Sequence, residues 1–205
     1  MKNQYFGDVR DLFKYDLIQR IFKEIRFLQR FTFIPMLTKN DPERGDGNMR
    51  DFDRAKKNGR QGTKNNMLMD FLEKYKEMDK DKRDFTEIEN YFKSEGIGTV
   101  IYKGHKYFKH GTRYEYFKSI PEEFLHKSLV FVDPDKGLQI KKSKKEHLLY
   151  QEVKDLYDRM DEDSILMIYQ HFPQARYKYE EYSPPGRSNR VHYLILTTKN
   201  KFYTW

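Results

Sequence analysis

The sequence predicts an α/β fold, a Rossmann-like three-layer sandwich with a mostly parallel sheet and an antiparallel C-terminal hairpin. The first observation behind this prediction is an apolar run, Leu129 to Val132, that leads directly into Asp133-Pro134-Asp135-Lys136-Gly137. A run without polar alternation is typical of a strand buried on both faces. The second observation is the order of periodicities, β-α-β-α-β, which favours right-handed crossovers and helices on both sides of a sheet.

The composition indicates one domain, residues 1–205, with a sizeable core. The chain has 205 residues, enough for a single core. Its 16 Tyr and 16 Phe argue against disorder, because these side chains supply large buried areas. The absence of cysteine excludes disulfides, thiolate catalysis and cysteine-bound zinc.

The net charge of +8 favours polyanionic partners, with nucleic acid first and acidic membrane surfaces second. The charges look evenly spread, so a soluble protein from a lysine-rich proteome is the alternative. The polar N-terminus shows no secretory signal. No apolar run approaches the roughly 20 residues that a membrane helix needs, so we expect a cytoplasmic protein without a membrane partner.

Hydrophobic spacing places the elements that precede the central run. Apolar residues recur at three- and four-residue intervals, as on the buried face of a helix. The predicted helices cover residues 11–28, 67–78 and 84–96, and the predicted strands cover 31–37 and 99–102. Pro35 suggests the end of a strand or a bulge.

A long polar stretch, residues 38–64, follows the first predicted strand. Stretches of this length inside a compact domain are usually functional or mobile, so we expect a mobile loop or lid. Asp41 lies in it and is counted among the candidate cofactor-binding residues.

The second half of the chain repeats the pattern of helix and strand. The predicted helices cover residues 116–120 and 149–160, and a second apolar strand covers 164–169. Residues 191–197 and 202–205 are expected to pair as the closing hairpin.

The loop after the central strand carries the first candidate site. Asp133 should end the strand, because Pro134 donates no ladder hydrogen bond and Gly137 permits a tight turn. Ligands of open α/β sheets bind at this carboxyl edge. Asp133 and Asp135 can hold Mg²⁺, act as a general base or orient a substrate amine. The alternative is ordinary turn chemistry.

The second candidate site is Gln170-His171, at the end of the next apolar strand. A neighbouring parallel strand would bring both side chains to the edge that holds Asp133. Histidine can move protons near neutral pH or bind a metal. The alternative is a histidine that is hydrogen-bonded by the adjacent loop.

A third group, Asp8, Asp11, Lys14 and Tyr15, lies at the start of the first predicted helix. Taken alone, this group favours a capped helix, since acids in a first turn suit the helix dipole. Asp8, Lys14 and Tyr15 nevertheless remain candidate cofactor-binding residues, together with Asp41, Pro134 and Gly137.

Lysines interleaved with tyrosines form the fourth candidate, a nucleic-acid-binding surface. Such a pattern suits phosphate contact and base stacking, and the alternative is a solvated face. The candidate residues are Lys103, Lys106, Lys109, Arg113, Lys141, Lys142, Lys144 and Lys145.

Several catalytic motifs are absent from the sequence. There is no G-x-G-x-x-G, Walker A, G-x-S-x-G or H-E-x-x-H pattern. Their absence disfavours a nucleotide kinase or serine hydrolase, and nicotinamide binding has no support.

Three segments together resemble a family of small uncharacterised bacterial and phage proteins. They are Tyr5-Phe6-Gly7-Asp8 followed by Lys14-Tyr15, the Asp-Pro-Asp-x-Gly-Leu segment from Asp133, and Tyr169-Gln170-His171-Phe172-Pro173. This family is distantly similar to class I S-adenosylmethionine-dependent methyltransferases. The resemblance implies a Rossmann-like fold, S-adenosylmethionine as cofactor and a target amine held at Asp133 and Pro134.

The leading hypothesis is therefore a methyltransferase-like enzyme acting on nucleic acid. In it, Asp133 orients or deprotonates the acceptor, while Gln170 and His171 complete the pocket. The second hypothesis is a metal-dependent nuclease or phosphodiesterase in which Asp133 and Asp135, joined by Asp8, hold Mg²⁺ and His171 assists a water. The third is a non-catalytic phage or mobile-element interaction protein.

Overall fold

The structure is a computed structural model that describes residues 1–41, 43, 50–141, 143–171 and 192–197. Its strands are β1 (Arg30–Pro35), β2 (Thr99–Ile101), β3 (Ser128–Asp133), β4 (Ile165–His171) and β5 (His192–Thr197). They form one sheet in the order β2-β1-β3-β4-β5. Four of them, β2, β1, β3 and β4, are mutually parallel. The central apolar run is thus the middle strand and ends at Asp133, as predicted.

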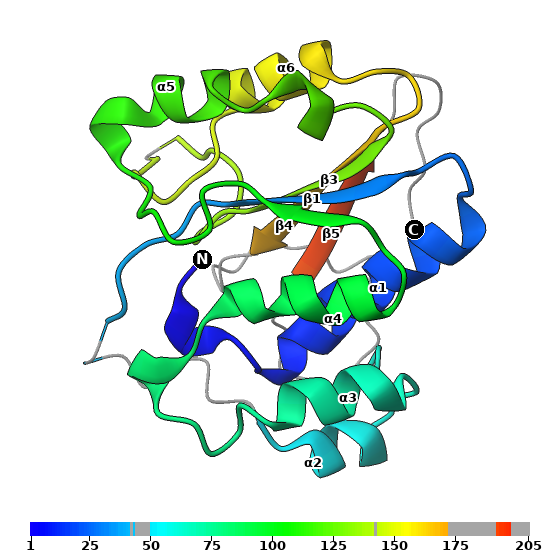
Figure 1. Cartoon of the computed structure of the whole chain (residues 1–205). Helices are drawn as coiled ribbons and strands as arrows, with labels where there is room; N and C mark the ends of the chain where they lie inside the picture. Colours follow the sequence, from blue (N-terminus) through cyan, green and yellow to red (C-terminus); the bar gives the residue numbers. More distant parts are fainter. Residues whose placement is uncertain (42, 44–49, 142, 172–191, 198–205) are drawn as a thin grey trace, which may run out of the picture.

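Helices cover both faces of this sheet. The α-helices are α1 (Val9–Glu24), α2 (Phe52–Lys57), α3 (Asn66–Glu73), α4 (Ile88–Ser94), α5 (Arg113–Lys118) and α6 (Tyr150–Arg159). Short 3₁₀ turns cover Asn3–Tyr5, Lys80–Lys82, Phe85–Glu87, His110–Thr112 and Glu122–Phe124. Figure 1 shows α5 and α6 on one side of the sheet and α1 to α4 on the other. The α/β class and the layered arrangement are confirmed.

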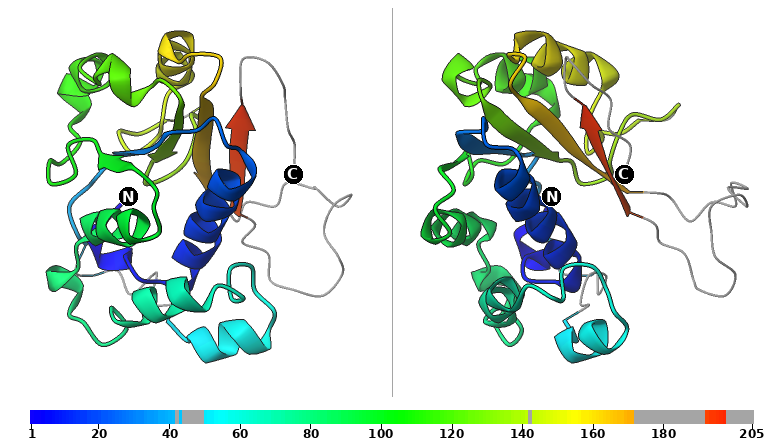
Figure 2. Two further views of the ribbon diagram at one scale, coloured as in Figure 1. Left: turned by 45° about the vertical axis from the view of Figure 1, so that its right-hand side comes forward. Right: turned by 90° about the vertical axis from the view of Figure 1, so that its right-hand side faces the viewer.

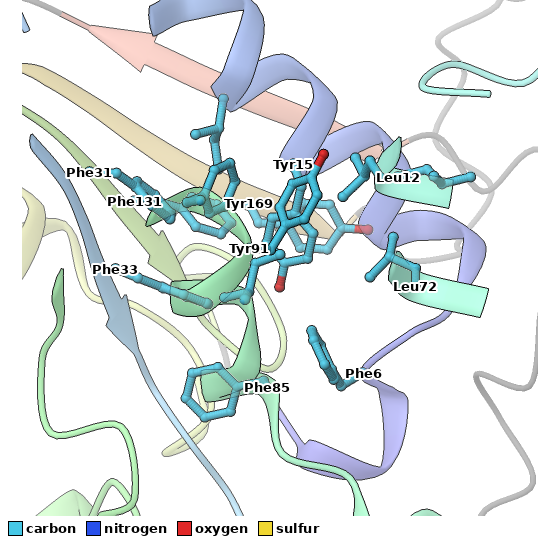
Figure 3. Close-up of a cluster of buried hydrophobic side chains, with 14 of the residues drawn as sticks. Phe6, Leu12, Tyr15, Phe31, Phe33, Leu72, Phe85, Tyr91, Phe131 and Tyr169 are labelled. Atoms are coloured by element: carbon cyan, nitrogen blue, oxygen red, sulfur yellow. The ribbon is translucent and has the colours of Figure 1, made fainter. Parts of the chain in front are cut away.

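Alternation along β3 divides the core into two halves. Leu129 and Phe131 face the side of α1, α3 and α4, where Phe131 stacks against Phe33 with ring centroids 5.0 Å apart (Figure 3). Val130 and Val132 face α5 and α6. Because β3 is buried on both faces, it needs apolar residues at every position, which explains its unbroken run.

The connections that follow the two neighbouring strands β1 and β3 pass over opposite faces of the sheet. β1 continues to β2 through α2, α3 and α4, whereas β3 continues to β4 through α6 on the other face. Neighbouring strands whose chains depart in opposite directions create a crevice at their carboxyl ends. The ends of β1 and β3 therefore define the place where a ligand site is expected.

The stretch 38–64 is more structured than the sequence prediction allowed. It contains α2, where the Asp51 carboxylate accepts a hydrogen bond from the Arg54 N–H at 2.8 Å. Phe52 and Ala55 are buried in the core beside α1 and α3. The predicted loop therefore contains a short helix at 52–57, which two apolar side chains anchor, and the mobility of the stretch stays a prediction. Residues 42 and 44–49 lie outside the described residues.

β5 forms the edge of the described sheet (red in Figure 2) and pairs with β4 in antiparallel register. The predicted C-terminal hairpin is not shown, because its second arm, 202–205, lies outside the described residues. Within the residues that are described, no helix is both long and apolar enough to cross a bilayer.

Candidate functional site

A pocket of about 90 Å³ lies at the carboxyl edge of the sheet, beside the ends of β1 and β3. Its wall comes from the N-terminal segment, the first two turns of α1, the end of β3 and β4. The residues in it that can carry chemistry are Asp8, Arg10, Asp11, Lys14, Asp133, Asp135 and Tyr169. The third and first candidate groups of the sequence therefore meet in one place.

Lys14 is the centre of the pocket's polar network. Its ammonium lies 2.7 Å from Asp11 Oδ1 and 3.2 Å from Asp133 Oδ2. All three side chains are at least nine-tenths buried. The ammonium also lies 4.8 Å from the ring centroid of Tyr169, a distance suited to a cation–π contact. One buried cation thus joins α1, β3 and β4.

Local chemistry at the start of α1 places these groups. Gly7 adopts φ +82°, and a Cβ there would lie 2.6 Å from the Cβ of Tyr75, so only glycine fits. Its N–H donates to Asp11 Oδ2 at 2.9 Å. Asp8 caps the helix by accepting from the Arg10 N–H. The capped helix expected from the sequence is present, and it also aims Asp11 and Lys14 at β3.

Asp133 reaches this network through the alternation of β3. It lies on the same face as Leu129 and Phe131, which is the face covered by α1. In the parallel pairing with β1 its partner is Pro35, the last residue of that strand. The side chain therefore projects at the crevice between the two strand ends.

Asp8 lies farther from its paired cation than Asp11 and Asp133 lie from theirs. Asp11 and Asp133 share the Lys14 ammonium, whereas Asp8 has Arg10 Nε at 4.0 Å. Burial, followed by repulsion from Asp11, raises the pKa of Asp8 to about 7. Burial alone would lower the pKa of Lys14, but Asp11 and Asp133 together hold it well above its ordinary value. Lys14 is therefore permanently charged, and Asp8 exchanges its proton near neutrality.

Asp135 lies on the other side of the same pocket. Its Oδ1 is 3.6 Å from the Met1 amine, and its Oδ2 accepts from the Thr38 hydroxyl at 3.3 Å. The Met1 amine in turn donates to Met36 O at 3.1 Å. These contacts attach the loop after β3 to the segment that follows β1.

Gln170 connects β4 to that loop. Its Oε1 accepts from the Leu138 N–H at 2.7 Å. Gly137 lies directly against this amide with φ +81°, and a Cβ there would be 2.7 Å from Oε1. Gln170 is therefore a positioning residue that sets the path of the loop, and it is not among the residues that line the pocket.

Substituting Gly137 with alanine should destabilise the fold. Positive φ costs an ordinary residue about 1–2 kcal/mol, and the new methyl group would also displace the Gln170 amide. We expect the midpoint of urea unfolding to fall accordingly. Gly111→Ala is the matched control, because a Cβ there meets nothing within 4 Å. Equal midpoints for the two variants would contradict this account of Gly137.

The remaining predicted cofactor residues lie outside the pocket wall. Tyr15 is fully buried in the core, with its ring edge against Phe92 at 5.8 Å. Asp41 Oδ2 lies 3.9 Å from Lys2 Nζ. Pro134 is buried in the loop after β3. The side chain of His171 lies outside the described residues, although its backbone ends β4.

The sequence prediction missed several residues of the pocket, among them Tyr169, Arg10, Lys2 and the amine of Met1. Tyr169 was quoted only as part of a motif, and Arg10 was not considered. Tyr169 shares the α1 face with Leu129 and Phe131. In the sequence, Tyr169 precedes the candidate His171 by two residues, so both lie on the same face of the strand. Only the pairing of β3 with β4 shows that this face lies beside Asp133.

Two segments together carry a net charge of +8, and we call them the basic segments: 103–118 after β2 and 136–150 after β3. They hold ten of the 40 Lys and Arg residues and two of the 32 Asp and Glu residues, which leaves 30 of each elsewhere. The whole net charge of +8 therefore resides in them.

The basic segments begin at the edge of the sheet that holds the pocket, since both follow carboxyl ends of parallel strands. The Phe108 N–H donates to Leu37 O at 2.7 Å, beside the end of β1. The candidate lysines that are exposed are Lys106, Lys109, Lys141, Lys144 and Lys145. Lys142 lies outside the described residues.

Arg113 and Lys103 have structural contacts. Arg113 Nη2 donates to Glu152 Oε2 at 2.8 Å and to His147 O at 2.9 Å, and its side chain is nearly buried. Lys103 Nζ donates to Ser119 Oγ at 2.8 Å. The prediction that Arg113 contacts phosphate was wrong, because Glu152 neutralises the guanidinium and holds the Arg113 side chain against α6.

The pocket fits a reacting group better than a whole cofactor. Drug-sized ligands occupy about 300–1,000 Å³, so S-adenosylmethionine does not fit entire into about 90 Å³. For Mg²⁺, two of the expected ligands already face a cation: Asp133 Oδ2 lies 3.2 Å from the Lys14 ammonium, and Asp135 Oδ1 lies 3.6 Å from the Met1 amine. Among the residues described, no three His, Asp or Glu side chains are arranged to hold a metal ion.

A larger open hollow of about 420 Å³ lies between α3 and α4. Phe71 and Tyr91 form its floor, with ring centroids 4.8 Å apart. Asp70 and Lys74 in its lining are exposed to solvent, and Glu95 accepts a hydrogen bond from Gln19 Nε2 at 3.0 Å. It therefore lacks the converging buried charges of the pocket at the sheet edge.

Comparison of the chain with protein-family models, with curated proteins and with solved structures finds no match. The resemblance to the bacterial and phage family stays a prediction. What the protein does must accordingly be argued from the pocket and its surroundings.

Proposed function

We propose that the chain is an enzyme that acts on nucleic acid and that Asp8 accepts a proton from the reacting group. The observation that carries this proposal is a buried carboxyl whose pKa is raised to about 7, in a pocket at the carboxyl edge of the sheet. A general base works best when its pKa lies near the working pH. Shifted carboxyls in clefts are characteristic of catalytic sites.

Lys14 and Asp133 support Asp8 by their positions. The ammonium of Lys14 lies between Asp11 and Asp133, whereas the cation nearest to Asp8 in an ion pair is Arg10 at 4.0 Å. Burial also raises the pKa of Asp11, although the adjacent Lys14 ammonium opposes this shift. A fixed positive charge beside the pocket would also stabilise negative charge that develops on the reacting group. In this scheme Asp133 is a positioning residue, and Asp8 is the general base in its place.

The substrate class follows from the basic segments. Both follow carboxyl ends of parallel strands, at the edge of the sheet that holds the pocket, and their summed charge equals the net positive charge of the chain. Nucleic acid is the polyanion that such a charge attracts most strongly.

Methyl transfer to an amine or hydroxyl of nucleic acid is the reaction that we place first. Because the pocket of about 90 Å³ is too small for the whole cofactor, it would receive the acceptor group, and the body of S-adenosylmethionine would have to bind outside it. Four parallel strands between helical layers support a Rossmann-like fold, in which ligands bind at the point where the crossovers diverge. The acceptor's proton would pass to Asp8. Phosphodiester cleavage with Mg²⁺ comes second, since Lys14 already occupies the cation position between two of the acids.

The test is an assay of purified chain on labelled DNA and RNA, with S-adenosylmethionine in one arm and Mg²⁺ in the other. We expect methylated nucleic acid in the first arm. The rate should rise with pH and level off above about 7, where Asp8 is deprotonated. Asp8→Asn should lower it by about 10²- to 10⁴-fold, because the amide cannot take the proton.

Asp53→Asn is the matched control, since this acid is exposed on α2 and does not line the pocket. Magnesium-dependent cleavage that survives Asp8→Asn and disappears in Asp135→Asn would replace the proposal with the nuclease hypothesis. Absence of product in both arms, from a folded chain that binds the same nucleic acids, would favour the non-catalytic hypothesis.

A further inference from the structure

Exposed aromatic side chains gather on the basic segments. Among the described residues, six large hydrophobic side chains are exposed, and four of them belong to these segments. Three of the four are tyrosines: Tyr107, Tyr114 and Tyr150, whose exposed fractions are 49%, 62% and 60%. Exposed rings beside lysines are the combination that binds bases and phosphates together.

Arg113 joins the two basic segments into one surface. It belongs to the segment 103–118, and it donates to His147 O in the segment 136–150. Its bidentate pair with Glu152 fixes the first turn of α6, next to Tyr150. The Tyr150 N–H in turn donates to Gln139 Oε1 at 3.1 Å. The three tyrosines are thus held on a packed framework and not on separate free loops.

Cations accompany the exposed rings. Lys118 Nζ lies 5.3 Å from the ring centroid of Tyr114. Lys106 and Lys109 flank Tyr107 in the sequence and are both exposed. The arrangement places a positive charge beside a ring that can stack, which matches the alternation of phosphate and base along a strand.

We infer that this surface binds single-stranded nucleic acid and presents it to the pocket. In a duplex the faces of the bases are stacked inside and cannot reach a protein ring, whereas each base of a single strand offers a free face. The binding claim stands on the surface alone. The claim that the bound strand is the substrate rests on the proposed function.

The inference is tested by fluorescence anisotropy with the full chain and short labelled oligonucleotides of one sequence, as single strands and as a duplex. We expect the single strand to bind more tightly. Tyr107→Ala, Tyr114→Ala and Tyr150→Ala should each weaken its binding by about 5- to 150-fold, as expected for the loss of one stacked base. Duplex binding should change little.

Phe27→Ala is the matched control, because Phe27 is an exposed aromatic residue between α1 and β1, at the amino end of a parallel strand. A second control, Lys56→Ala with Lys57→Ala, removes exposed charge from α2. In contrast, Lys144→Ala with Lys145→Ala should reduce the slope of log affinity against log salt by about 0.7 per lysine that contacts phosphate.

Each outcome bears on one claim. Equal binding of single strand and duplex, with the tyrosine variants unchanged, would overturn the inference and leave the proposed enzyme intact. Binding of polyglutamate as tight as that of the oligonucleotides would show a general polyanion surface and would also overturn it. No binding of any nucleic acid would overturn the proposed function itself. Circular dichroism of the variants confirms that they are folded.

Discussion

Lys14→Met is expected to destabilise the protein by about 3–5 kcal/mol at about pH 8, the usual cost of removing one partner of a buried ion pair. The variant keeps the length and apolar stem of the side chain, so packing is largely preserved. What it removes is the ammonium that neutralises Asp11 and Asp133, both of which are buried. Urea unfolding followed by circular dichroism measures the loss.

The loss in Lys14→Met should shrink as the pH falls. Burial raises the pKa of Asp11, and without the ammonium nothing on Lys14 opposes this shift. A raised folded pKa gives stability that is fully present below the unfolded pKa and is lost as the pH rises, so the variant should approach wild type as the pH falls toward about 4.

Lys93→Met provides the comparison for this experiment. Lys93 also pairs with a carboxylate on a helix, at 2.6 Å from Glu89 Oε1, but its side chain is exposed. Its removal should cost no more than about 0.5 kcal/mol. If Lys14→Met cost equally little, the buried network would not be the ion-paired cluster described above.

Asp8→Asn is expected to stabilise the protein above neutral pH while removing its activity. The folded pKa of Asp8 is raised to about 7 from an ordinary value of 3.8. Between these values the folded state binds a proton that the unfolded state has released, so wild-type stability falls as the pH rises. The fall is about 1.4 kcal/mol for each pH unit in this window.

Asparagine resembles the protonated carboxyl and does not titrate. It also remains a good N-cap for α1, so the helix start should be retained. The unfolding free energy of the variant should therefore lack the decline between about pH 4 and pH 7, and above pH 7 it should exceed that of wild type by up to about 4 kcal/mol. Unfolding curves across this pH range give the measurement.

Asp53→Asn serves again as the control and should follow the wild-type pH dependence, because its carboxylate is exposed. A wild-type stability that is flat between about pH 4 and pH 7 would contradict the raised pKa of Asp8. If Asp8→Asn raises the stability and abolishes the activity, the protein retains a buried acid that lowers its stability because the reaction needs that acid.

Local patterns accounted for much of the fold. The central strand and its end at Asp133, the long first helix and the strand order of β3 beside β4 followed from apolar periodicity and the crossover rules. The helix at 52–57 was not predicted, because six residues with only two buried side chains give too short a periodic signal.

Roles within the candidate site were harder to predict. Arg113 reads as one more cation in a basic run, but Glu152, 39 residues later, neutralises it. Gln170 reads as a pocket residue, but its amide is used by the Leu138 N–H. In both cases the partner that decides the role is distant in the sequence, and nothing in the local pattern identifies it.

By itself, the sequence determined that this protein has a sheet with a buried central strand, that the strand ends in acids, and that positive charge follows it. These are consequences of residue types and short spacings. Only the tertiary structure decided that Lys14 meets Asp133, 119 residues away, and that Asp8 is left without an equal partner. The reason is physical: a buried carboxyl changes its pKa according to the charges around it, and folding alone chooses those neighbours.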